Sequence, residues 1–266
     1  MIGFALDMDG TVYHGERPIE GVKEFIDNLI ANNIPFRFIT NNSSHSRSFY
    51  GDRLRRMGFN IRDEDVLTST IATLRFLKEE RAGKTVCPVA TEDVMAEIVA
   101  SGVPLATWDQ NPDIVLFTYD TTIDYAKINA IYHALANGSE LVVTHPDDVC
   151  PSESGYDIDV GPFITMFESL SGRKATVVGK PNRLILDMAA LEMGVPADKI
   201  VMAGDRLSTD IQMAVDAGCS SILVLSGETD RALLEASGLK PTFVYNSVAD
   251  VDIFDIMDTL STNHLN

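Results

Sequence analysis

The amino-acid sequence predicts an α/β protein in which a doubly wound parallel sheet is interrupted by an inserted α/β domain. Three observations lead to this fold class. Short apolar runs alternate with segments of helical spacing at both ends of the chain. The middle of the chain repeats that alternation by itself, and polar residues follow directly where apolar runs end. A chain of 266 residues is long enough for two such domains.

The N-terminal part contains two apolar runs, residues 2–6 and 34–39, which we expect to be buried strands. Residues 21–32, between them, carry apolar side chains at helical spacing, which predicts a crossover helix between parallel strands. Two further helices are predicted over residues 46–57 and 69–80.

The C-terminal part shows the same order of elements. The expected strands and helices alternate over residues 176–178, 183–193, 200–203, 209–217 and 221–225. Because both ends of the chain predict βα units of one parallel sheet, we assign residues 1–79 and 179–266 to a single core domain.

The middle of the chain, residues 80–178, has enough elements of its own for a separate cap domain. The expected strands are residues 85–89, 114–118 and 141–144, and the expected helices are residues 92–101, 125–137 and 161–171. The sequence therefore predicts that the cap domain is inserted between the two halves of the core.

Composition excludes several classes of partner. The formal net charge of −18 and the sequence pI near 4.5 oppose binding to nucleic acid or to an anionic membrane surface. The N-terminus has no basic flank, and no apolar run approaches the ~20 residues that span a bilayer, so we expect a cytoplasmic protein. Cys87, Cys150 and Cys219 lack the spacing of a disulfide framework or a zinc site.

Polar side chains gather at the predicted carboxyl ends of four strands, where parallel sheets bind ligands. In chain order they are Asp7 with Asp9, Thr40 with Asn41 and Asn42, Lys180, and Asp205 with Asp210. Taken singly, each has an ordinary structural explanation as a helix cap, a turn or a surface charge. Their order and placement together favour phosphoryl transfer.

That reaction needs an anionic nucleophile beside a cation, because the phosphate under attack is itself anionic. We expect Asp7 to be the nucleophile, with Mg²⁺ held by the Asp7 and Asp205 carboxylates and the Asp9 carbonyl. Asp9, two residues beyond Asp7 in extended chain, is expected to protonate the leaving group and then to activate water. Gly10 allows the turn that follows Asp9, and we expect it to belong to the phosphate-binding site.

Thr40 and the backbone amides beside it are expected to receive phosphoryl oxygens at the start of the next helix. Lys180 is expected to add a positive charge opposite them. Together these residues predict a site for a small phosphorylated metabolite.

Four segments resemble the motifs of the haloacid dehalogenase superfamily: DMDGT at 7–11, TNN at 40–42, GKP at 179–181 and GDRLSTD at 204–210. TVYHG at 11–15, GRKATVVGKP at 172–181 and SGETDRALL at 226–234 are similar to its NagD-type phosphatases.

The resemblance implies a Rossmann-like core with a large α/β cap. It also implies that Asp7 is the nucleophile and Asp9 the acid and base. Thr40, Asn41 and Lys180 would hold the phosphoryl group, with Asp7, Asp9 and Asp205 on Mg²⁺ and Asp210 in support. Residues 11–15 would form a flap beside the nucleophile.

The cap segment 144–163 departs from the family pattern. His145 stands where asparagine is frequent, and Asp157 and Asp159 add charge before Gly161. If these side chains face the site, they favour a substrate with hydroxyl or cationic groups over a second phosphate. A solvated loop is the alternative, so the substrate stays open between sugar phosphates, nucleotides and similar esters, with 4-nitrophenyl phosphate as a generic test compound.

Several activities remain to be weighed. Asp9 favours phosphate chemistry over dehalogenation, and the absence of membrane spans in the sequence excludes a P-type pump. A phosphotransferase differs only in the acceptor that meets the aspartyl-phosphate, and a non-enzymatic phospho-accepting signalling module would present similar residues. The inserted cap of ~100 residues favours a hydrolase that closes over its substrate. The sequence predicts no particular oligomeric state.

Overall fold

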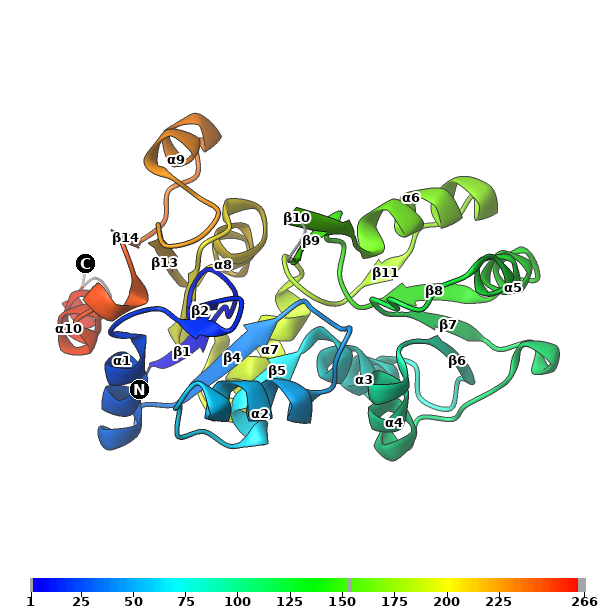
Figure 1. Cartoon of the computed structure of the whole chain (residues 1–266), viewed down its shortest axis with the longest axis horizontal. Coiled ribbons are helices and arrows are strands. Elements are labelled where there is room, and N and C mark those ends of the chain that lie inside the picture. Colours follow the sequence, from blue (N-terminus) through cyan, green and yellow to red (C-terminus); the bar gives the residue numbers. More distant parts are fainter. Residues whose placement is uncertain (1, 153–154, 263–266) are drawn as a thin grey trace. The chain divides into compact units, whose positions relative to one another are not determined.

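A computed structural model describes residues 2–152 and 155–262 and confirms the mixed α/β class (Figure 1). The chain packs into two compact units. The core unit comprises residues 1–39, 50–66 and 186–266, and the cap unit comprises residues 40–49 and 67–185. The domain boundaries at 79/80 and 178/179 stay predictions. Within the described ranges, every helix is too short or too polar to cross a lipid bilayer.

A six-stranded sheet forms the centre of the core unit. Its order is β14 (Phe243–Tyr245), β13 (Ser220–Val224), β12 (Ile200–Gly204), β1 (Gly3–Leu6), β4 (Phe36–Thr40) and β5 (Val66–Thr68). β1 pairs in parallel with both β12 and β4. The chain builds the sheet outward in both directions from the β1–β12 pair, so their carboxyl ends lie at the topological switch point, where such sheets bind ligands.

Over the described residues, the α-helices of the core unit are α1 (Val22–Ala31), most of α2 (Arg47–Arg56) and of α7 (Arg183–Met193), α8 (Gln212–Ala217), α9 (Arg231–Ser237) and α10 (Ile253–Thr262). In α1, the side chains at Val22, Phe25, Ile26 and Leu29 are buried, as the helical spacing predicts. The helix predicted over residues 209–217 begins instead with a π-helical turn at Leu207–Ile211, which leads into α8.

The cap unit has a parallel sheet of its own. Its order is β11 (Thr176–Val177), β8 (Glu140–Val143), β7 (Ile114–Phe117) and β6 (Val86–Val89). The helices are α3 (Ser69–Glu80), α4 (Glu92–Ser101), α5 (Tyr125–Ala136) and α6 (Val160–Ser171). Side chains from one face of the sheet, such as Phe117 of β7 and Val143 of β8, form a buried cluster with Leu135 of α5 and Phe167 of α6. Figure 1 shows α3 and α4 beyond the other face of this sheet.

Two hairpins, the strands β5 and β14, and the helices α9 and α10 were not predicted from the sequence. β2 (Tyr13–His14) pairs with β3 (Arg17–Pro18), and β9 (Val149–Ser152) pairs with β10 (Gly155–Ile158). The second hairpin lies in the cap segment that departs from the family pattern. Over the described residues, part of that segment therefore forms paired strands.

Candidate active site

Three buried carboxylates converge at the switch point of the core sheet. Oxygen atoms of Asp7, Asp205 and Asp210 all lie within 4.8 Å of one another. The register of β1 and β12 explains the approach of the first two, since Leu6 is paired with Ala203 and the Asp7 N–H donates to the Ala203 carbonyl at 2.8 Å. Asp210 joins them from the π-helical turn. The structure therefore brings together three acidic residues expected from the sequence.

The surroundings of Asp205 disfavour the negative charge of its carboxylate. Burial, and then the negative charges of Asp7 and Asp210, raise its pKa to about 8. Its Oδ2 accepts a hydrogen bond from the Glu228 N–H at 2.7 Å. Its Oδ1 is buried and has no hydrogen-bond partner among the described residues. A buried oxygen in this state is costly unless another group satisfies it.

A divalent cation fits this donor set. Mg²⁺ prefers carboxylate and carbonyl oxygens and keeps several waters, so it needs only a few protein ligands. The unsatisfied Oδ1 of Asp205 and the concentration of negative charge are both features that a cation would relieve. The residues present therefore fit the metal that the sequence motifs imply.

Asp9 lies two residues beyond Asp7 in the core unit. Although its side chain is exposed, the protein atoms packed around the carboxylate raise its pKa, and the charge of Asp7 acts in the same direction. Arg53, His14 and Arg206 oppose this shift. A raised pKa is what a carboxylic acid needs in order to donate a proton near neutral pH.

The segment 11–15, expected to be a flap, contains β2 and leads into its hairpin with β3. Arg53 anchors it: the guanidinium lies 4.7 Å from the centre of the Tyr13 ring and donates to the Gly15 carbonyl at 2.6 Å. These contacts fix the turn that begins at Gly10, whose φ of +81° favours glycine.

In the cap unit, Asn41 and Lys180 are held together by two hydrogen bonds. The Lys180 N–H donates to Asn41 Oδ1 at 2.8 Å, and Asn41 Nδ2 donates to the Lys180 carbonyl at 2.9 Å. Lys180 is buried, as is Asn41. The second and third sequence motifs therefore meet through this pair.

The expected position of Thr40 at a helix start is wrong. α2 begins only at Arg47, and a polar loop fills the interval. Thr40 Oγ1 accepts the Asn42 N–H at 3.1 Å, and the Asn42 side chain in turn accepts the Ser44 N–H at 3.0 Å. These local bonds stabilise a turn and compete with helix formation, as short polar side chains do.

His145 and Asp159, two departures from the family pattern, are partners of each other. His145 Nε2 and Asp159 Oδ1 lie 2.9 Å apart, and both side chains are buried. Nδ1 of the ring lies 3.0 Å from Thr144 Oγ1, and Asp159 also caps α6 by accepting the Val160 N–H. The third residue, Asp157, is exposed on β10. Asp159 therefore stabilises the cap and is not part of a solvated loop.

The protonation of His145 depends on that partner. Burial alone would lower its pKa, but the hydrogen bond and charge of Asp159, together with Asp147, outweigh burial and the opposing charge of Lys180, so the pKa is raised. Sequence spacing did not reveal this pair, because the two residues are 14 positions apart and the β9–β10 hairpin lies between them.

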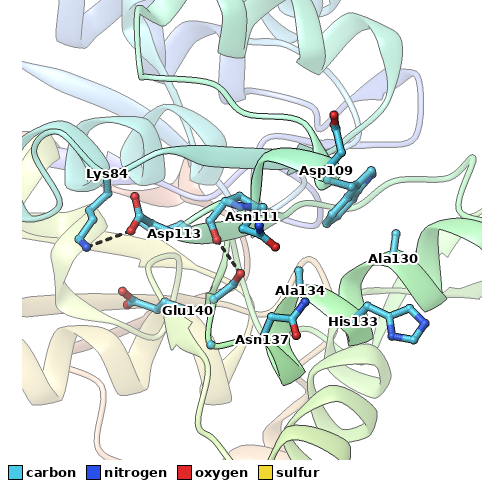
Figure 2. A pocket seen from close by; sticks show the side chains of 14 residues that line it. Lys84, Asp109, Asn111, Asp113, Ala130, His133, Ala134, Asn137 and Glu140 are labelled. Atoms are coloured by element: carbon cyan, nitrogen blue, oxygen red, sulfur yellow. Dashed lines mark hydrogen bonds and ion pairs between the residues drawn. The ribbon is translucent and has the colours of Figure 1, made fainter.

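Two of the cavities in the cap unit lie at the ends of strands of its sheet. One, of about 680 Å³, lies at the amino ends of β7 and β8, and Figure 2 shows Lys84 bonded there to Asp113. The motif residues Asn41 and Lys180 do not line it. Another, of about 270 Å³, lies where β7 ends and is lined in part by Tyr119, Asp157 and Phe163. The second lies at the carboxyl edge of the cap sheet, where parallel sheets bind ligands.

Known proteins resemble this chain over nearly its whole length. Family models match residues 4–104 as a haloacid dehalogenase-like hydrolase and residues 177–251 as HAD-hydrolase-like. Dihydroxyacetone phosphatase of Corynebacterium glutamicum (strain R) is 31% identical over 250 residues, covering 94% of this chain and 90% of that protein.

Two solved structures extend the likeness. The 4-nitrophenylphosphatase of Thermotoga maritima superposes with a TM-score of 0.89 at 35% identity, covering 94% of this chain and 95% of that one. NagD from Escherichia coli K-12 gives a TM-score of 0.87 at 28% identity, covering 95% and 98% of the two chains.

The buried His145–Asp159 pair predicts a pH-dependent stability. Since the folded-state pKa of His145 is raised above its unfolded value of 6.5, the pair stabilises fully below about pH 6.5 and loses this contribution as pH rises through the folded-state pKa. Asp159→Asn keeps a capping side chain for α6 but removes the charge. We expect it to lower the free energy of unfolding by about 3–5 kcal/mol below pH 6.5, measured by urea denaturation. A loss of equal size at pH 6 and pH 9 would contradict this assignment.

Proposed function

Because the chain belongs to the haloacid dehalogenase-like hydrolases and resembles their NagD-type phosphatases, we propose that it hydrolyses small phosphate monoesters through an aspartyl-phosphate on Asp7, with Mg²⁺ as cofactor. The observation that carries this proposal is the buried cluster of Asp7, Asp205 and Asp210, in which Asp205 Oδ1 lacks a partner among the described residues. Such a cluster is suited to a cation beside a carboxylate nucleophile.

The first step forms a bond between an Asp7 carboxylate oxygen and phosphorus while the ester P–O bond breaks. The departing oxygen takes the proton of the Asp9 carboxyl, whose raised pKa keeps that proton available. In the second step, water gives a proton to the Asp9 carboxylate and attacks phosphorus, while the bond between phosphorus and the Asp7 oxygen breaks. Inorganic phosphate leaves, and Asp7 returns to its starting state.

Asp7, Asp205 and the Asp9 carbonyl would hold Mg²⁺, with Asp210 in support. When bound, the cation supplies the positive charge that lets an anionic nucleophile approach an anionic phosphate. The protein supplies a rigid arrangement, because Asp7 and Asp205 follow two paired strands and Asp210 accepts the Arg206 N–H at 3.2 Å. Rigid placement lowers the entropy cost of the reaction.

Thr40, Asn41 and Lys180 are the proposed ligands of the phosphoryl oxygens, with Gly10 allowing the turn after Asp9. The two hydrogen bonds between the Asn41 side chain and the Lys180 backbone support this grouping, because they hold the two residues side by side. Lys180 would offset negative charge on the phosphoryl group, and Asn41 would orient it.

Substrate size is proposed from the names of relatives and from the cap. One relative is a dihydroxyacetone phosphatase and another a 4-nitrophenylphosphatase, both named for small esters. Asp157, exposed beside the cavity of about 270 Å³, is a candidate contact for a hydroxyl or cationic group of the substrate. Phosphotransfer to another acceptor is the competing activity, since it shares the first chemical step.

The first test uses 4-nitrophenyl phosphate with and without Mg²⁺. We expect turnover only with the cation, and we expect Asp7→Asn to reduce kcat by at least about 10³-fold, because loss of a nucleophile costs that or more. Asp109→Asn, which changes an exposed cap carboxylate, is the matched control and should keep wild-type activity. Turnover by Asp7→Asn at the wild-type rate would contradict the proposed nucleophile. Product formation only when an alcohol acceptor is added would favour a phosphotransferase.

The second test separates the two steps through Asp9→Asn. The 4-nitrophenolate group leaves with little need for a proton, so the first step should survive, whereas water activation in the second step should fail. Stopped-flow absorbance is expected to show a burst of about one nitrophenolate per enzyme, followed by turnover slowed about 10²–10⁴-fold. Slow turnover without a burst would contradict the proposal that an aspartyl-phosphate forms and that its hydrolysis depends on Asp9.

A further inference from the structure

Glycines make room for the carboxylates of the acidic cluster. A Cβ atom added at Gly10 or at Gly227 would overlap Asp205 Oδ2, and one added at Gly204 would overlap the carboxylate of Asp210. These glycines follow or end three different strands, β1, β12 and β13. The Cβ position of Gly10 also lies only 3.1 Å from the Gly227 Cα. The Asp205 carboxylate is thus confined in a slot between Gly10 and Gly227.

The slot distinguishes the two oxygens of Asp205. Oδ2 lies between the glycines and accepts the Glu228 N–H at 2.7 Å. Oδ1 is buried and has no hydrogen-bond partner among the described residues. Since Oδ2 is confined and bonded, Oδ1 is the oxygen left to serve the cluster with Asp7 and Asp210.

The loop that carries Gly227 is tied on both sides of that residue. Ser226 Oγ donates to the Gly10 carbonyl at 2.7 Å, which joins the two walls of the slot. On the other side, Arg206 Nε lies 3.0 Å from Glu228 Oε2, which links the loop to the residue after Asp205. The slot is therefore closed by contacts that do not involve the Asp205 side chain.

We propose that Gly227, together with the Glu228 amide, is a positioning element that holds Asp205 Oδ1 toward the divalent cation and so sets the affinity for Mg²⁺. This inference rests on the proposed function, because it presumes that the acidic cluster binds the cation. Groups that orient metal ligands commonly change metal affinity by about 10–100-fold when they are altered. A glycine that served only to let the loop fold would affect stability and leave cation affinity unchanged.

The test is calorimetric titration of the full-length Gly227→Ala protein with Mg²⁺ in the absence of substrate. We expect Mg²⁺ to bind about 10–100-fold more weakly than to wild type, because the added methyl group displaces Oδ2 and rotates the carboxylate. Gly238→Ala is the control, since Gly238 ends α9 at a φ of +70° and an added Cβ there meets nothing within 4 Å. It should lose stability through backbone strain but bind Mg²⁺ as wild type does.

Ser226→Ala provides a second variant in case Gly227→Ala does not fold. It adds no atoms and removes only the hydrogen bond to the Gly10 carbonyl, so we expect a smaller loss of Mg²⁺ affinity in the same direction. Wild-type affinity in Gly227→Ala, or in Ser226→Ala if Gly227→Ala does not fold, would overturn the positioning role while leaving the proposed function intact. An equal loss in Gly238→Ala would do the same. Failure of the wild-type protein to bind Mg²⁺ would overturn both.

Discussion

The mutual repulsion of three buried carboxylates is the constraint on which the core unit depends. Asp7, Asp205 and Asp210 place oxygens within 4.8 Å of one another in a region shielded from water. Burial, and then the charges of Asp7 and Asp210, raise the pKa of Asp205 to about 8. Acidic side chains are rarely buried together unless a cation or a proton compensates them. The cluster is therefore understandable as half of a site that a divalent cation completes.

The sheet topology explains how these residues meet although they are distant in sequence. β1 and β12 are neighbours because the chain fills one side of the sheet first and returns to fill the other. Their paired carboxyl ends deliver Asp7 and Asp205 to one place, and the π-helical turn after β12 delivers Asp210. The glycines beside them supply the space that the carboxylates occupy. The topology of the sheet thus places the three carboxylates together at the ends of β1 and β12.

Most of the core strands and the acidic residues at their ends were predictable from the sequence, because these residues directly follow the apolar runs that form the strands. Asp7 and Asp205 each stand directly after such a run, and the parallel fold then requires them to converge. The strand β5, with only three residues, is too short to give a periodic signal. Thr40 was misplaced at a helix start because a turn held by its own side chain is not distinguishable from a cap by residue type.

The His145–Asp159 pair could not be predicted for a different reason. Its partners meet only after the β9–β10 hairpin has formed, and neither strand of that hairpin alternates between apolar and polar residues clearly enough to be recognised. The proposed role of Gly227 could not be predicted either, because it depends on contact with Gly10, which lies more than 200 positions away in the sequence. Tertiary contacts of this kind leave no local pattern in the chain.

The most direct test of the central claim is the unfolding of Asp205→Asn beside wild type at pH 8.5, with and without Mg²⁺. Asparagine keeps an acceptor for the Glu228 N–H and replaces the repelling charge, so the metal-free variant should be more stable than metal-free wild type. Mg²⁺ at about 100 times its dissociation constant should stabilise wild type by about 2.7 kcal/mol and leave the variant nearly unchanged. A variant that is less stable without metal, yet gains as much from Mg²⁺ as wild type, would contradict the account.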